Sequence, residues 1–353
     1  MEIVLKTSNT DESRIFTSDF SYLNSFVSSR CENKRVFALI DKKILNFPAY
    51  SSLTKNLDTF AVTASERVKT LKTAEKIYKF LLEKKADRDS FILAIGGGIT
   101  LDIAGFVAST YMRGMKFGFI PTTLLAMVDA SIGGKNGVNF LGFKNYVGTF
   151  NHPEFVAICP YFLKTLPKKQ FNVGLAEVIK YGAISDKKIL DFLEDTNSFK
   201  ALKEEKNLKF IIEKSAKIKA EIVEKDFTES GLRKILNFGH TLGHALERIK
   251  KVSHGEGVAA GMIFAAFLSV KYEYLKVENL KKLEKILKKY SLPVFVEDVS
   301  EKEIIEGIAG DKKKSGDLIQ FVLLKDFGKP FVKSLTLSEI EEGLNDLRKH
   351  YGK

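Results

Sequence analysis

Three of the five histidines stand close together in the chain. His240 and His244 are four residues apart, and His254 follows shortly after them. Upstream, Glu177 and Lys180 have the i, i+3 spacing that places two side chains on one face of a helix. Two imidazoles and a carboxylate are good zinc ligands that leave a coordination position open for a substrate. Spacing alone favours His240 and His244 as the imidazole pair, and this choice is provisional.

A glycine triplet, Gly96-Gly97-Gly98, follows the apolar run 91–95 and precedes a helical pattern over 101–111. This order predicts a buried strand, a tight turn and a helix N-terminus, where a pyrophosphate can approach the backbone. The triplet is not the G-x-G-x-x-G fingerprint, and a tight turn without a ligand is the alternative. Asp41 ends an upstream apolar run, where it is placed either to bind ribose hydroxyls or to serve as a helix N-cap.

The segment 129–137 is dense in glycine and polar residues, with Thr122-Thr123 before it and Lys144-Asn145 after it. A loop so rich in donors suits phosphate oxygens. An ordinary surface loop is the alternative, and the apolar residues just before the segment disfavour it. Further cations stand beside the other motifs: Arg113, Lys180, Lys219, Arg233 and the lysines at 312–314.

The elements that position these groups differ between the two halves of the chain. Up to about residue 160, apolar strands alternate with helical patterns, which predicts a parallel sheet with crossover helices. Amphipathic helical patterns dominate the rest, with a strand pair expected near 318–332. We therefore expect an α/β domain at 1–160 and a mainly α-helical domain at 161–353, closely packed with a cleft between them.

Composition narrows the class of protein. The net charge of +12 suits either a nucleic-acid-binding protein or an enzyme with a pocket for an anionic substrate. Only nine of the 56 basic residues are arginine, which favours the enzyme and no nucleic-acid partner. The apolar stretch 257–268 is shorter than the roughly 20 residues of a membrane span, so we expect a buried helix there and no membrane partner. No signal peptide is visible, and Cys31 and Cys159 are expected to be reduced thiols in a cytoplasmic protein.

Six stretches together resemble the 3-dehydroquinate synthase family. They are GGGITLDIAGFVASTYMRG from Gly96, PTTLLAMVDASIGGKNGVN from Pro121, GLAEVIKYG from Gly174, GLRKILNFGHTLGHALE from Gly231, HGEGVAAGM from His254 and DKK from Asp311. The family pattern commonly has glycine at the position of Leu101, so we expect the turn there to be already helical or to be re-formed.

The resemblance implies an N-terminal NAD-binding α/β domain with a parallel sheet, a mainly helical metal-binding C-terminal domain, and a homodimer. It implies a lyase that uses catalytic NAD⁺ and one divalent metal ion, Zn or Co. The substrate would be the sugar phosphate 3-deoxy-D-arabino-heptulosonate 7-phosphate, and the products 3-dehydroquinate and phosphate. The same NAD would accept a hydride and return it, while phosphate leaves by β-elimination with the substrate's own phosphate as base.

The resemblance also implies roles for residues. Glu177, His240 and His254 become the metal ligands, and His244 faces the substrate instead. The NAD contacts become Asp41, Glu66, Lys69, Gly96, Gly97, Gly98, Asp102, Thr122, Thr123, Lys144, Asn145 and Thr165. The substrate contacts become Arg113, Asp129, Lys135, Asn145, Lys180, Lys219, Arg233, Asn237, His244 and a lysine of 312–314.

Among the substrate contacts, Lys219 and Arg233 would bind the substrate carboxylate. If the stretch from Arg233 to His240 is helical, Arg233 lies about two turns before the metal ligand and on the same face. This carboxylate contact distinguishes the family from other sugar-phosphate cyclases, which make an inosose or a valiolone and need no such contact. A metal-dependent polyol dehydrogenase of the same fold is a further alternative, and it would release NADH.

Overall fold

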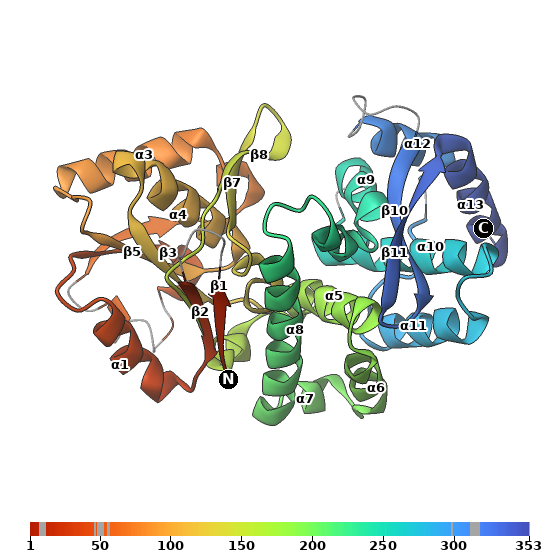
Figure 1. The fold of residues 1–353 in the computed structure, drawn as a ribbon, viewed down its shortest axis with the longest axis horizontal. Coiled ribbons are helices and arrows are strands. Elements are labelled where there is room, and N and C mark those ends of the chain that lie inside the picture. The colour runs from red at the N-terminus through yellow and green to blue at the C-terminus, as the bar shows by residue number, and fades with distance from the viewer. Residues whose placement is uncertain are drawn as a thin grey trace. The chain divides into compact units, whose positions relative to one another are not determined.

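The computed structural model describes residues 1–6, 12–45, 47, 53–54, 57–250, 252–297, 299–310 and 318–352. Contacts divide the chain into two compact units, shown in Figure 1. Unit 1 comprises Met1–Pro167 and Leu208–Thr228, and unit 2 comprises Lys168–Asn207 and Glu229–Lys353. The domain boundary near residue 160 stays a prediction. No helix among the described residues is both long and apolar enough to cross a membrane.

Unit 1 is built on a seven-stranded sheet in the order β1-β2-β9-β6-β5-β3-β4. Its strands are β1 Glu2–Lys6, β2 Glu12–Thr17, β3 Val36–Asp41, β4 Asp58–Val62, β5 Phe91–Gly96, β6 Lys116–Pro121 and β9 Phe155–Ile158. All neighbours are parallel except the β1–β2 pair, which confirms the predicted parallel sheet. Every residue of β5 is buried, as expected of a central strand covered on both faces.

Helices cover both faces of this sheet, with α3 and α4 on one side and α1 on the other (Figure 1). The helical elements of unit 1 are α1 Phe20–Arg30, η1 Lys42–Ile44, η2 Glu66–Val68, α3 Leu71–Glu83, α4 Gly98–Thr110, η3 Tyr111–Arg113, η4 Ala126–Ala130, η5 Pro160–Thr165 and α8 Glu205–Lys225. Most of α8 clusters with unit 1 although it follows the first helices of unit 2 in sequence. The terminal amine of Met1 pairs with Glu213 of α8 at 3.3 Å.

The prediction of a donor-rich loop over 129–137 is wrong, because both ends of this segment have regular secondary structure. Asp129 belongs to the π-helical turn η4, and the segment from Lys135 onward forms the hairpin of β7 (Lys135–Phe140) and β8 (Phe143–Phe150). Most residues between Ser131 and Val138 are buried. The Asn136 side chain also fixes the position of this segment by donating to two backbone carbonyls. Lys135 is the exposed exception.

Unit 2 is mainly helical, as predicted. Its elements are α5 Lys168–Ile184, α6 Lys187–Asp195, α7 Phe199–Leu202, η6 Leu232–Asn237, α9 His240–Lys250, α10 His254–Lys271, α11 Val277–Lys289, α12 Glu301–Gly310, β10 Leu318–Asp326, β11 Lys329–Thr336 and α13 Leu337–His350. Helix α10 is apolar on nearly all sides and buried, which confirms the core helix expected over 257–268. The expected strand pair is the antiparallel hairpin β10–β11.

Both cysteines of the chain are buried, and they form no disulfide. Burial raises the pKa of Cys31 to about 11, so its thiol stays protonated and unreactive near neutral pH. The cysteines therefore behave as small apolar core residues.

Candidate active-site residues

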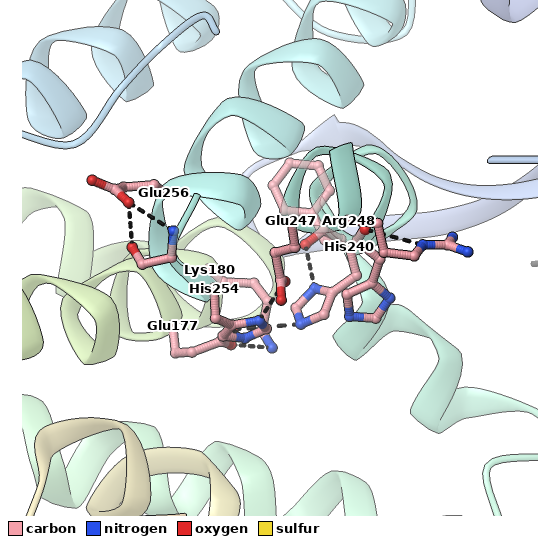
Figure 2. Close-up of polar contacts among 10 residues, drawn as sticks. Glu177, Lys180, His240, Glu247, Arg248, His254 and Glu256 are labelled. Atoms are coloured by element: carbon pink, nitrogen blue, oxygen red, sulfur yellow. Dashed lines mark hydrogen bonds and ion pairs between the residues drawn. The ribbon is translucent and has the colours of Figure 1, made fainter. Parts of the chain in front are cut away.

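Three donor side chains converge within unit 2 (Figure 2). Glu177 comes from α5, His240 is the first residue of α9, and His254 is the first residue of α10. The Glu177 Oε1 atom lies 3.1 Å from His254 Nε2 and 3.5 Å from His240 Nε2. One donor atom from each residue lies within 4.8 Å of the others, a spacing that suits a single divalent ion.

The local sequence explains why the two imidazoles meet. The chain just before α9 approaches α10 so closely that a Cβ atom on Gly261 would lie 1.9 Å from the carbonyl oxygen of Gly239. Gly239 has a φ of +80°, which ends the preceding segment and lets α9 start at His240. At the start of α10, Ser253 and Glu256 form a capping box. The ring centroids of His240 and His254 are consequently 5.4 Å apart.

The charges in this cluster are unequal. Lys180 forms an ion pair with Glu177, as its i, i+3 position predicts, and both side chains are almost fully buried. Burial, helped by the Lys180 charge, lowers the pKa of His240 to about 3. Burial also disfavours the charged form of His254, but hydrogen bonds to Glu177 and Glu247 outweigh it and raise the pKa of His254 to about 10. Without a metal ion, the charges of Lys180 and of a proton on His254 therefore balance those of the Glu177 and Glu247 carboxylates.

His244 does not join the group around Glu177. It is exposed, its ring centroid lies 5.3 Å from that of His240, and its donors group with Glu247 and His254 instead. Among the described residues, Glu177 groups with His240 and His254, the imidazole pair that the resemblance implies, and not with the pair His240 and His244 that spacing favoured. Glu247 is absent from the sequence-based set although it ends one of the quoted motifs.

Unit 1 contains a second polar cluster, made of residues predicted to contact NAD. Buried Lys69 contacts both Asp102 of α4 and Asn145 of β8. Asn139 joins them, because its side chain donates to Glu66 at 2.8 Å and accepts from the Asn145 amide at 2.9 Å. Sequence reasoning missed Asn139, although it is the last residue of the motif that begins at Pro121.

The glycine triplet closes β5 and opens α4, as predicted. Gly97 is the N-cap with an extended backbone, and the Leu101 amide donates to the Gly97 carbonyl at 3.1 Å. The backbone is thus already helical at Leu101, so a side chain there causes no strain. The triplet is needed for space instead, since a Cβ on Gly96 would lie 2.7 Å from the Thr100 side chain.

Other predicted NAD residues lie around the carboxyl ends of the strands. Asp41 ends β3, and its side chain accepts a hydrogen bond from the Lys43 amide, which is the turn-capping alternative. The Thr122 amide donates to the Gly96 carbonyl at 2.9 Å, and the Thr123 hydroxyl accepts from the Ala126 amide. Lys144 and Thr165 are exposed.

The predicted substrate residues are distributed over both units, and they differ in burial and in their contacts. In unit 1, Lys219 of α8 pairs with Asp129 at 2.7 Å. In unit 2, the Asn237 side chain donates to Glu229 at 2.8 Å. Arg113 and Lys135 are exposed. The 312–314 lysines and Asp311 lie outside the described residues.

The expectation that Arg233 and His240 lie on one face of a single helix is wrong. Arg233 lies in the 3₁₀ helix η6, which ends at Asn237, and the chain turns at Gly239 before α9 begins. A 3₁₀ turn followed by a break changes the rotation between the two side chains. Arg233 is only 2% exposed, so it is no surface arginine.

Comparisons with known proteins identify the family of the chain. Two family models match the chain, the 3-dehydroquinate synthase N-terminal model over residues 59–173 and the C-terminal model over residues 174–314. A 3-dehydroquinate synthase of Clostridium tetani is 42% identical over 324 residues, covering 89% of this chain and 87% of that protein. One from Thermoanaerobacter pseudethanolicus is 40% identical over 337 residues, covering 91% and 93%.

Solved structures share the fold at low identity. A 2-deoxy-scyllo-inosose synthase, complexed with carbaglucose-6-phosphate, NAD⁺ and Co²⁺, has a TM-score of 0.87 at 24% identity and covers 98% of this chain and 100% of its own. A probable glycerol dehydrogenase from Sinorhizobium meliloti has a TM-score of 0.68 at 15% identity, covering 95% and 96%. The fold alone therefore does not separate cyclases from dehydrogenases, but the family models and the relatives near 40% identity do. This chain belongs to the 3-dehydroquinate synthase family.

Proposed function

We propose that the chain converts 3-deoxy-D-arabino-heptulosonate 7-phosphate to 3-dehydroquinate and phosphate, a step of the shikimate pathway to the aromatic amino acids. Family membership points to this reaction, and the convergence of Glu177, His240 and His254 is the observation that supports it best. The enzyme is a lyase that eliminates phosphate and depends on NAD⁺ and a divalent metal ion, Zn²⁺ or Co²⁺.

Glu177, His240 and His254 would hold the metal ion, because one carboxylate and two imidazoles form a donor set suited to zinc or cobalt. When bound, such an ion lowers the pKa of the substrate hydroxyls that it contacts. Lys180 offsets the charge of Glu177 and carries its ammonium group beside the ion site. In this proposal the same ammonium group would also contact a phosphate oxygen of the substrate.

The carboxyl ends of β3 and β5 would bind the dinucleotide. These strands are parallel neighbours, so Asp41 and the glycine triplet lie at the same edge of the sheet. The N-terminus of α4 offers backbone amides to the pyrophosphate, and Asp41 would bind ribose hydroxyls. Bound NAD⁺ supplies a hydride acceptor that returns the hydride within one turnover. The remaining proposed contacts are Glu66, Lys69, Asp102, Thr122, Thr123, Lys144, Asn145 and Thr165.

Substrate binding would divide between phosphate and carboxylate contacts. Arg233 and Lys219 would bind the carboxylate, with the planar guanidinium placed for two parallel hydrogen bonds. The phosphate would be held so that its own oxygen removes the proton during elimination. Its proposed contacts are Lys135, Asn145, Lys180 and His244, and Arg113, Asp129 and Asn237 complete the substrate set.

Incubation with the heptulosonate phosphate, substoichiometric NAD⁺ and Zn²⁺ or Co²⁺ tests this function. We expect phosphate release well beyond the amount of NAD⁺ added, with no lasting absorbance from NADH. Accumulation of NADH in proportion to product would support a polyol dehydrogenase instead. Turnover of a carboxylate-free sugar phosphate would support another sugar-phosphate cyclase.

The homodimer and the cytoplasmic location are also part of the proposal. The family resemblance supports the dimer, and two buried cysteines without a disulfide suit a reducing compartment. Sedimentation equilibrium would give the mass of the assembly, and a mass of one chain would contradict the dimer.

A further inference from the structure

We propose that Glu247 is a positioning residue that fixes the metal-binding orientation of His254 and thereby sets the affinity for the divalent ion. The proposal rests on the metal site of the proposed function. It adds a carboxylate outside the ligand set, contributed by α9 to the imidazole at the start of α10.

Glu247 and Glu177 contact opposite nitrogens of the same ring (Figure 2). The Glu247 Oε1 atom lies 2.9 Å from His254 Nδ1, and the Glu177 Oε1 atom lies 3.1 Å from His254 Nε2. A carboxylate can only accept from the ring, so Glu247 keeps a proton on Nδ1, and a bound ion would replace the proton that Nε2 shares with Glu177. The Nε2 lone pair is then directed at the ion site.

Glu247 is well placed to hold this orientation. Its side chain is only 6% exposed, so solvent competes little for its oxygen atoms. It follows His240 by seven residues on α9, which is about two turns and the same helix face. One rigid helix therefore carries a proposed ligand and the group that orients another.

The other imidazole is oriented differently. His240 Nδ1 lies 3.2 Å from the Phe238 carbonyl, a neutral acceptor supplied by the backbone just before α9. His254 has a charged acceptor from a side chain, which makes the ring a stronger donor to a cation. Replacement of Glu247 can therefore change one ligand and leave the other unchanged.

Binding of Zn²⁺ and Co²⁺ to the full-length chain, by competition with a chromophoric chelator, tests the proposal. We expect Glu247→Ala to weaken binding about 10- to 100-fold, the range for loss of a ligand's hydrogen-bond partner. Glu247→Gln keeps an acceptor of the same shape without its charge, so its effect should be smaller. The visible absorption spectrum of bound Co²⁺ should shift in Glu247→Ala, because the His254 ring loses its fixed orientation.

Glu256 provides the matched control. It is a carboxylate two residues after His254 on α10, and it bonds to the amide and hydroxyl of Ser253 rather than to a proposed ligand. Glu256→Gln should lower thermal stability through the weakened capping box, with the Co²⁺ spectrum and the dissociation constant unchanged. A purely structural role for Glu247 would make the two variants alike.

Each result decides the proposal. Wild-type affinity and an unshifted Co²⁺ spectrum in both Glu247 variants would overturn it and leave the proposed function standing. Two ions per wild-type chain and one per Glu247→Ala chain would make Glu247 a ligand, in the group with His244 and His254, and would also overturn it. Failure of the wild-type chain to bind either ion would overturn the proposed function as well. If Glu247→Ala does not fold, the isosteric Glu247→Gln gives the same comparison.

Discussion

The two polar clusters differ in what completes them. In unit 1, Lys69 contacts Asp102 and Asn145, and Asn139 contacts Asn145 and Glu66, so each charged or amide group has a partner from the chain itself. In unit 2, acids outnumber the cationic side chain, and the donors point at a common position. The first cluster is a framework of hydrogen bonds formed within the chain, whereas the donors of the second converge on a position that suits a proton or a metal ion. We therefore expect the two clusters to respond differently to substitution, metal and pH.

The largest expected difference concerns metal binding by the histidines. His254→Ala removes a proposed ligand and should weaken Zn²⁺ binding more than about 100-fold, beyond the range for loss of a ligand's hydrogen-bond partner. His244→Ala should change it little, because His244 lies outside the group around Glu177. Chelator competition measures both constants. Equal losses in the two variants would contradict the ligand assignment.

Breaking the cluster around Lys69 should lower stability without any effect of metal. Lys69→Met leaves the Asp102 carboxylate without its cation, and loss of one partner from a buried pair costs about 3–5 kcal/mol. Urea unfolding measures the change. Lys79→Met is the control, since its exposed pair with Glu83 is worth at most about 0.5 kcal/mol. A loss in Lys69→Met as small as that of the control would show that Lys69 does not hold this cluster together.

The carboxylate contact gives a smaller, substrate-dependent effect. Arg233→Lys replaces a planar fork with a point charge and should weaken substrate binding by about 1.5–3 kcal/mol. The KM for the heptulosonate phosphate would rise roughly 10- to 150-fold by that conversion. Metal content and NAD⁺ binding should not change. An unaltered KM would favour a substrate without a carboxylate.

The smallest expected effect is a pH dependence confined to the metal-free protein. The pKa of His254 is about 10 when folded and 6.5 by default, so its protonated form contributes stability that is fully present below about pH 6.5. That contribution is lost as the pH rises toward 10. The Tm of the metal-free protein should therefore fall as the pH rises over this range. A metal-free His254→Ala chain should lack the fall, and the same fall there would place its origin elsewhere.

Local patterns in the sequence predicted most of the fold. Apolar runs gave the parallel strands of the first half, and amphipathic patterns gave the mainly helical character of the second half. Periodicity cannot assign an element to a unit, because an amphipathic helix has the same pattern whichever core it covers. For this reason α8 was expected with the helical half, although most of it clusters with unit 1.

The resemblance assigned roles to many residues of the quoted motifs, but two residues within those motifs were missed because only long-range contacts show their role. Glu177 and His254 are 77 positions apart, and the resemblance rather than the spacing grouped them. Asn139 and Glu247 make their contacts through folding of a hairpin and a helix pair, which no local pattern shows. Gly239 interrupts the chain between Arg233 and His240, so the assumed continuous helix gave the wrong face.

The backbone contact between α9 and α10 also determines how the protein can be handled. His240 and His254 each begin a helix, and the backbone at Gly239, just before α9, touches α10 at Gly261, where no side chain intervenes. The main chain therefore sets the distance between the two imidazoles, and that distance persists after the ion is removed. An emptied sample should accept a different ion on dialysis, so one preparation serves cadmium NMR, cobalt optical spectroscopy and zinc enzymology.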